Sequence, residues 1–279
     1  MRTVIILVAI ALAGLAGGAL FIYSGFYNVA ATEQHTAPVY WLLNAAMRRS
    51  VQHRVDEISV PPLTDPALVA RGLPLYRLHC VQCHGAPGVA PEGFALGMMP
   101  LPANLALTAR EWKNPAEIFW VAKFGIKTSG MPAWEFRLSD EELWAIVAFV
   151  RTLSLQSPKE YEALVHAAER GGVSSRAAAP TGISSAAVDL DRGKVALQQY
   201  ACVTCHVIPG VVAASNPVGP SLAGIATRGY LAGIVPNTRD NMVRWLRSPR
   251  TVDPASAMPD LGVTERDAQD IAAFLDTLR

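Results

Sequence analysis

The sequence predicts an all-α protein in which one N-terminal transmembrane helix is followed by two copies of a small helical domain. Three observations lead to this prediction. Residues 4–23 form an uncharged apolar run, a Cys-x-x-Cys-His motif occurs twice, and each motif lies among helical patterns in the same order. The predicted boundaries are 1–31 for an anchor, 32–64 for an amphipathic connector, 65–155 for the first domain, 156–188 for a helix and flexible linker, and 189–279 for the second domain.

The N-terminal apolar run is long enough to cross a membrane. Its twenty residues would rise about 30 Å as a helix, which matches the hydrocarbon core of a bilayer. A cleaved signal peptide is the alternative interpretation, but its apolar region is usually shorter, and the nearest small-residue cleavage site lies at 29–31. We therefore expect a single uncleaved anchor.

Residues 37–51 predict a helix after the anchor. Thr36 suits an N-cap, and Pro38 suits the first helical turn. Tyr40 and Trp41 suit a membrane interface. Two interpretations stay open: an amphipathic helix on the bilayer or against a partner's transmembrane helices, and a connector packed on the first domain.

The two Cys-x-x-Cys-His motifs use all four cysteines of the chain. The Cys-x-x-Cys-His signature is that of c-type haem attachment, in which two thiols form thioether bonds and the following histidine lies under the iron. A redox dithiol is one alternative, but a thioredoxin-like motif lies in a βαβ pattern, which this sequence does not show. A four-cysteine zinc site is the other, but it would join motifs more than a hundred residues apart and leave both histidines unexplained. The sequence therefore predicts two covalently attached haem c groups, held by Cys80, Cys83 and His84 in the first domain and by Cys202, Cys205 and His206 in the second.

One methionine in each domain is predicted as the second axial ligand of the iron. Met131 follows the first motif and Met258 follows the second, and each is directly followed by proline. Histidine–methionine coordination raises the potential and favours electron transfer. The predicted iron ligands are His84, Met131, His206 and Met258.

Other ligands were weighed against these two methionines. Met98 and Met99 are further candidates in the first domain, whereas Met242 is interpreted as a core residue. Bis-histidine coordination is the other alternative. The histidines available for it have no counterparts in both domains; they are His35, His53, His79 and His166.

Backbone carbonyls that follow the motifs are expected to orient the ligating histidines. Such a carbonyl accepts a hydrogen bond from the ring nitrogen that does not bind the metal. Pro102 and Pro220 are suitably placed for this role.

Helical patterns recur in the same order in both domains. In the first, helices are predicted at 66–76, at 115–124 and after a capping box at 139–142, and in the second at 190–200, at 238–247 and after a cap at Thr264. Pro74 predicts an irregular last turn of the first of these helices. A further short helix is expected within 155–172, before a linker at 173–187 that is rich in Ala, Ser, Gly and Pro.

Charge excludes one class of partner. Residues 65–152 contain eight basic and eight acidic side chains, and residues 189–279 contain nine of each. Nucleic-acid binding therefore has no electrostatic basis in either domain.

Both domains resemble class I cytochrome c domains in the order helix, Cys-x-x-Cys-His, proline loop, helix, Met-Pro, helix. The first domain, with Ser129-Gly-Met-Pro-Ala-Trp134 and the capping box at 139–142, is similar to the small domains of membrane-bound dihaem cytochromes, including the dihaem subunit of cbb3-type oxidases. The second, through residues 231–249 and Met258-Pro259, resembles the cytochrome c domain fused to subunit II of caa3-type oxidases.

These resemblances imply an electron carrier rather than an enzyme. The expected protein is a membrane-anchored dihaem cytochrome c of a respiratory chain, which delivers electrons to or within a terminal oxidase complex and has no small-molecule substrate. Its expected partners are redox proteins of a membrane oxidase or another respiratory complex. Because haem c is attached outside the cytoplasm, the haem domains are expected on the periplasmic side of the inner membrane.

Two other functions stay open at this point. One is the electron-accepting cytochrome subunit of a periplasmic dehydrogenase. The other is a dihaem peroxidase, which would need one haem with an open or displaceable coordination site.

Overall fold

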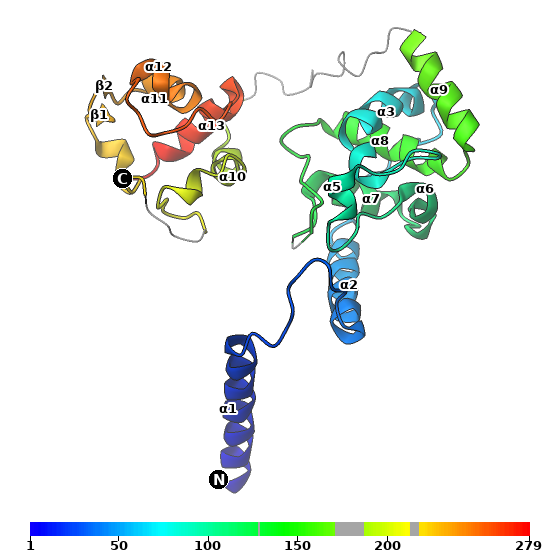
Figure 1. Ribbon diagram of the computed structural model, residues 1–279, viewed down its shortest axis with the longest axis horizontal. Coiled ribbons are helices and arrows are strands. Elements are labelled where there is room, and N and C mark those ends of the chain that lie inside the picture. The colour runs from blue at the N-terminus through cyan, green and yellow to red at the C-terminus, as the bar shows by residue number, and fades with distance from the viewer. Residues whose placement is uncertain (128, 171–186, 213–217) are drawn as a thin grey trace. The chain divides into compact units, whose positions relative to one another are not determined.

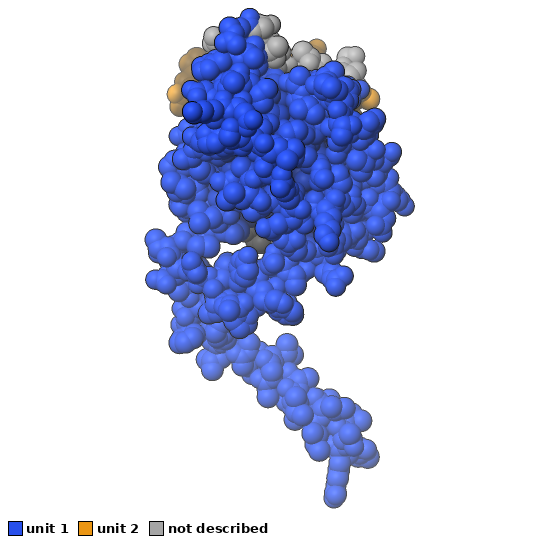
Figure 2. All heavy atoms as spheres, turned by 90° about the vertical axis from the view of Figure 1, so that its right-hand side faces the viewer, with its two compact units in different colours: residues 1–183 blue, residues 184–279 orange. Residues whose placement is uncertain are grey.

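The computed structural model describes residues 1–127, 129–170, 187–212 and 218–279 (Figure 1). The described chain is mostly helical, which confirms the predicted all-α class. It divides into two compact units, residues 1–183 and 184–279, which Figure 2 shows in different colours.

Helix α1 (Arg2–Tyr23) contains the apolar run and has no buried residue. Of the residues that the structure describes, only this helix is long and apolar enough to cross a membrane. A membrane anchor and a signal sequence both have this length and position. Helix α2 (Ala37–Gln52) follows it, with Pro38 in its first turn as predicted.

The core of the first unit lies where two of its helices cross. Helix α3 (Pro66–His79) packs on α8 (Asp140–Leu153). Tyr76, Leu143 and Phe149 are almost fully buried there. The remaining helices of this unit are α4 (Val81–His84), α5 (Gly93–Leu96), α6 (Leu105–Thr108), the 3₁₀ helix η1 (Ala109–Glu111), α7 (Pro115–Phe124) and α9 (Pro158–Arg170).

Helix α3 continues past Pro74 and ends at His79, three residues beyond its predicted end at Tyr76. A proline inside a helix removes one backbone hydrogen bond. Leu73, Leu75 and Tyr76 on either side of this proline are buried in the core that α3 forms with α8. Tertiary packing therefore offsets the lost hydrogen bond, and the helix runs directly into the cysteine motif.

The segment between the two domains agrees with its prediction where it is described. Helix α9 lies within the stretch 155–172 that was expected to be helical. Its Tyr161 is buried against the core of the first unit. The predicted linker at 173–187 lies outside the described residues, apart from Ala187.

The second unit repeats the crossing of a first and a last helix. Helix α10 (Leu190–Gln199) packs on α13 (Glu265–Leu275), and α11 (Arg239–Arg247) packs on α13 as well. The shorter elements are the 3₁₀ helices η2 (Cys202–Thr204) and η3 (Ile225–Thr227), and α12 (Pro249–Val252).

A small hairpin in this unit was not predicted from the sequence. Strands β1 (Tyr230–Leu231) and β2 (Val235–Pro236) pair antiparallel. Gly233 has a φ of +75°, a left-handed conformation that glycine adopts easily, and it allows the tight turn between the strands.

Buried charges join α10 to α13. The Arg192 Nε lies 2.8 Å from a carboxylate oxygen of Asp270, and the Tyr200 hydroxyl donates to Asp267 at 2.7 Å. The backbone N–H of Asp189 donates to Asp270 at 2.9 Å. A buried carboxylate is tolerated when it is paired and hydrogen-bonded, so these contacts specify how the two helices meet.

Candidate haem sites

In the first domain the cysteine motif lies directly at the end of α3. Cys80 ends that helix, and α4 carries Cys83 and His84. The His84 Nδ1 lies 2.7 Å from the carbonyl oxygen of Ala103. Because a carbonyl can only accept, Nδ1 carries the proton and Nε2 keeps a free lone pair. The expected acceptor Pro102 was therefore wrong by one residue, since the chain turns so that the next carbonyl faces the ring.

Burial also lowers the pKa of His84. Desolvation is the main cause, and the hydrogen bond to Ala103 acts in the opposite direction. The neutral imidazole is the form that binds a metal. The surroundings of His84 therefore favour the protonation state that an iron ligand needs.

The second motif has the same arrangement in a different local structure. Cys202 begins the 3₁₀ helix η2. The Nδ1 of His206 donates to the carbonyl oxygen of Pro220 at 2.7 Å, which confirms the acceptor that the sequence predicted. Gly219 lies against the ring, because a Cβ there would be 2.8 Å from the histidine Cε1. Only glycine allows this segment to hold the imidazole so closely.

The first cysteine of each motif lacks the lowered pKa of a redox-active thiol. All four are free of disulfides. Burial raises the pKa of Cys80 to about 12 and that of Cys202 to about 11. Redox-active and metal-binding cysteines have lowered pKa values, because the thiolate is the reactive form. The donor set of each motif fits thioether attachment of a haem better than a redox or zinc site.

Met131 lies in the loop between α7 and α8. Its backbone N–H donates to Ser129 Oγ at 3.2 Å, and its carbonyl accepts from Ile126 at 3.2 Å. Gly125, with a φ of +67°, lies under the loop, where a Cβ would be 2.8 Å from the Met131 carbonyl oxygen. Met98, one of the other candidate ligands, packs its sulfur beside Gly130 in the same loop. The structure therefore brings two of the three candidate methionines together.

Met258 lies in a matching loop of the second domain. Its backbone N–H donates to Ser256 Oγ at 3.1 Å. Met258 and Cys202 pack against the same hydrophobic cluster. In the first domain Cys80 packs against the hydrophobic core. Met131 is not one of the described residues that pack against this core. Met242 is buried in the core, as the sequence predicted.

The serines of these loops were missed by the sequence prediction. Each lies two residues before the methionine and accepts its N–H. The signal was present, because Ser-x-Met-Pro occurs in both domains, as Ser129-Gly-Met-Pro132 and Ser256-Ala-Met-Pro259. A side chain that accepts from the backbone two residues on is an ordinary way to hold a turn.

Alanine in place of Ser129 or Ser256 is expected to loosen the methionine loop without unfolding the domain. The loss of one hydrogen bond corresponds to about 1 kcal/mol. In a domain of this size that shifts a thermal transition by about 4–8 °C. The measurement is the temperature at which the ferric charge-transfer band of methionine-ligated haem disappears. Ser59→Ala, at an exposed position, is the matched control, and an equal shift in this control would contradict the role of the loop serines.

The four histidines that were candidates for bis-histidine coordination lie in surroundings that differ from one another. The His35 Nδ1 lies 2.7 Å from the Tyr27 hydroxyl, and the His79 ring packs on Trp134 at 4.7 Å between centroids. His166 lies between Glu162 and Glu169 on α9. His53 is the exposed residue that ends α2.

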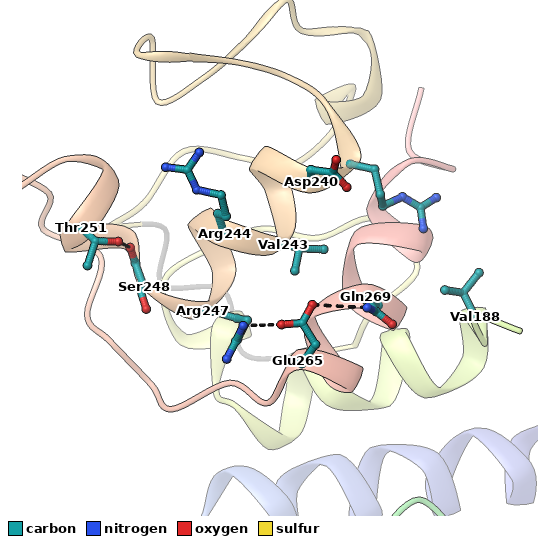
Figure 3. Close-up of a pocket in the computed structure, with 10 residues that line it drawn as sticks. Val188, Asp240, Val243, Arg244, Arg247, Ser248, Thr251, Glu265 and Gln269 are labelled. Carbon is teal, nitrogen blue, oxygen red and sulfur yellow. Dashed lines mark hydrogen bonds and ion pairs between the residues drawn. The ribbon is translucent and has the colours of Figure 1, made fainter. Parts of the chain in front are cut away.

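A groove on the second domain is separate from these residues (Figure 3). It has a volume of about 610 Å³ and lies beside α11 and α13, where Arg247 forms an ion pair with Glu265. None of the residues that line it belongs to the cysteine motif or to the methionine loop.

The fold agrees with comparisons to known proteins. Residues 67–150 match the family model described as "Cytochrome C oxidase, cbb3-type, subunit III", and residues 190–279 match that described as "Cytochrome c". The chain therefore contains two cytochrome c domains. The first is similar to cbb3-type subunit III, and the second is distantly similar to the cytochrome c portion of caa3-type oxidase subunit II.

Three curated relatives illustrate this similarity. The chain is 26% identical over 90 residues to cytochrome c oxidase subunit 2 of Alkalihalophilus pseudofirmus, which covers 32% of this chain and 25% of that protein. It is 27% identical over 88 residues to cytochrome c oxidase subunit 2 of Bacillus sp. (strain PS3), covering 30% and 25%. It is 31% identical over 137 residues to quinohemoprotein alcohol dehydrogenase of Comamonas testosteroni, covering 46% and 18%.

The chain thus spans a quarter or less of the length of each of these relatives. No solved structure was found to match it.

Proposed function

We propose that this protein is a membrane-anchored dihaem electron-transfer cytochrome c of a respiratory chain, which delivers electrons to or within a terminal oxidase complex. The observation that carries the proposal is the repeated site. In both domains the motif histidine donates from Nδ1 to a backbone carbonyl at 2.7 Å, and a Ser-x-Met-Pro loop precedes the last helix. An electron carrier with two similar centres needs such a repeat.

The residues that would hold each haem are those predicted from the sequence. Cys80 and Cys83 would attach one group, and Cys202 and Cys205 the other. His84 and His206 would bind the iron through Nε2, because Nδ1 of each ring donates to a backbone carbonyl. Met131 and Met258 would supply the opposite ligand from loops held by their serines. A haem held in this way supplies reversible one-electron oxidation and reduction at a raised potential.

The chain's own residues would tune this chemistry by excluding water. Cys80 and Cys202 each pack against an apolar core, and a low-dielectric surrounding of this kind affects the potential of a nearby iron. No side chain is required to transfer a proton or bind a substrate in this role.

Helix α1 would serve as the anchor, with the haem domains on the periplasmic side of the inner membrane. The proposal follows from its length and from the uncharged apolar run at residues 4–23. The domain boundaries proposed from the sequence, 65–155 and 189–279, leave both cytochrome c domains after the anchor.

A potentiometric titration of the holoprotein in lipid nanodiscs tests the proposed centres. Two one-electron steps at positive potential are expected, each with the charge-transfer band of methionine-ligated ferric haem. A high-spin centre, or a low-potential centre without that band, would contradict histidine–methionine ligation in one domain and support the peroxidase interpretation.

One observation favours a second candidate function. The relative that covers the largest share of this chain among the three is a quinohemoprotein alcohol dehydrogenase. An electron-accepting subunit of a dehydrogenase would use the same two centres. Purification of the tagged chain from native membranes distinguishes the two. A copurifying oxidase that takes up oxygen with the reduced cytochrome supports the first proposal, whereas a copurifying dehydrogenase that reduces the cytochrome supports the second.

A further inference from the structure

Helix α2 has two halves in contrasting environments. Its C-terminal half is docked on the first domain, where Val51 is 1% exposed and packs with Val55 and Ala116 of α7. Met47 packs against the same cluster. Arg48 adds an ion pair to Glu111 at 3.7 Å. The helix is therefore held on the domain at this end, as one of the two sequence interpretations expected.

The N-terminal half is uncovered. Tyr40, Trp41, Leu42 and Leu43 are 58%, 69%, 60% and 48% exposed, respectively. The helix has no charged residue before Arg48. Bulky apolar side chains of this kind favour removal from water by about 25 cal/mol per Å² of their surface. An exposed cluster of four therefore indicates a contact outside the domain.

The spacing of these four residues indicates what covers them. Successive residues of a helix are about 100° apart, so four consecutive side chains cover all of its sides. A groove on a partner protein takes one stripe of a helix, at spacings of three and four residues. Lipid can surround the whole circumference of a helix. The first turns of α2 therefore fit a bilayer better than a protein groove.

The order of residue types along α2 also indicates a contact with the membrane. Tyrosine and tryptophan prefer the membrane interface, and cationic side chains favour anionic lipid headgroups. Arg49 is exposed, no cationic residue other than Arg48 precedes it in the helix, and the helix contains no acidic residue. Trp41 and Arg49 are separated by a rise of about 12 Å along the helix, so the apolar turns and the cationic turn can lie at different levels of the interface.

We infer that the first two turns of α2 insert into the interfacial layer of the membrane and hold the first domain at its surface. This inference rests on the proposed membrane location of the protein. The segment 24–36 between α1 and α2 spans at most about 45 Å when fully extended, so α2 begins within reach of the bilayer. A second contact prevents free rotation of the first domain about the anchor and presents its haem in one orientation.

Single introduced cysteines test this contact in the holoprotein. Since the native cysteines are expected to form thioether bonds, Trp41→Cys, Leu42→Cys or Gln52→Cys creates the one reactive thiol of its variant. Gln52 is exposed at the docked end of the same helix and serves as the control. The probe is a charged, membrane-impermeant maleimide, used on protein in nanodiscs of phosphatidylethanolamine and phosphatidylglycerol.

Labelling of Trp41→Cys and Leu42→Cys is expected to be slower than that of Gln52→Cys by about tenfold or more, because inserted side chains are shielded from water. Equal rates overturn the inference. Rapid labelling in nanodiscs with protection in native membranes also overturns it, and identifies a protein as the occupant. The visible spectrum of each variant shows whether its haem domains are folded. If one of the Trp41→Cys and Leu42→Cys variants does not fold, the other is compared with Gln52→Cys.

Two further measurements test the proposed function independently of the contact between α2 and the membrane. Labelling of the wild-type protein would show that its cysteines do not hold haem. The mass of the purified chain shows whether α1 is retained. Labelling rates read at the introduced cysteine itself, by mass spectrometry of its peptide, decide the inference about α2 in either case.

Discussion

Replacement of Met258 by alanine is expected to lower the reduction potential of the second domain by about 0.1 V or more, a fraction of the roughly 0.8 V over which axial ligands set haem potentials. The charge-transfer band of methionine-ligated ferric haem should disappear from that domain alone. Met131→Ala should have the same effect in the first domain. The reason is that methionine coordination raises the potential of a histidine-ligated iron. Potentiometric titration of each single variant beside the wild type is the measurement.

Two other methionines provide matched controls. Met242→Leu changes a residue that is 3% exposed in the core of the second domain, and it should leave both potentials unchanged. Met98→Leu changes the residue that packs beside Gly130, and it should keep the band. If Met98→Leu removes the band and Met131→Ala does not, Met98 is the ligand and the assignment of Met131 is wrong.

Alanine in place of Gly72 or Gly193 is expected to destabilise the corresponding domain by about 2–3 kcal/mol, as overpacking of a closely fitted core does. A Cβ at Gly72 would lie 2.0 Å from the carbonyl oxygen of Ala145, and one at Gly193 would lie 2.1 Å from that of Asp270. Both obstacles are backbone atoms of the last helix of the domain, which cannot rotate away. The helices would have to separate, although they form the core of each domain.

Overpacking and helix propensity predict opposite changes in stability for these variants, so the direction of the change distinguishes them. Helix propensity alone predicts that glycine to alanine stabilises a helix by about 1 kcal/mol. Gly93→Ala in α5 is the control in the first domain, because a Cβ there meets nothing within 4 Å. Gly229→Ala in the second domain is a control for steric space only, because Gly229 lies outside the helices. Thermal unfolding of each domain is followed through its haem absorbance. Stabilisation of the Gly72 or Gly193 variant would show that the helix crossing tolerates a side chain.

Local signals in the sequence predicted the helices well. The capping box at the start of α8 is present as expected, since Ser139 accepts from the Glu142 N–H and Glu142 accepts from the Ser139 N–H. Thr264 caps α13 in a similar way by accepting from the Asp267 N–H. These contacts join residues three positions apart, so the chain's local sequence is sufficient to specify them.

Contacts between distant residues were predicted less well. The acceptor for His84 is Ala103, nineteen residues later, and the expected Pro102 was wrong. Packing on α8 extends α3 to His79, beyond the predicted end at Tyr76. Nothing in the sequence patterns indicated the role of Gly72, because its close neighbour Ala145 is far away along the chain. In each case the energy that decides the outcome comes from a part of the chain that a local pattern does not include.

The sequence by itself determined the chemistry and the division of the chain. Cysteine spacing, histidine position and repeated Met-Pro pairs predicted two cytochrome c domains, because covalent attachment and iron ligation require those residue types in that order. The assignments of Met131 and Met258 remain predictions. Only the tertiary structure decided which carbonyl orients each histidine, which glycines allow the helices to cross, and which half of α2 is docked. Those features depend on the packing of surfaces that are distant in the sequence, and packing is defined only once the chain has folded.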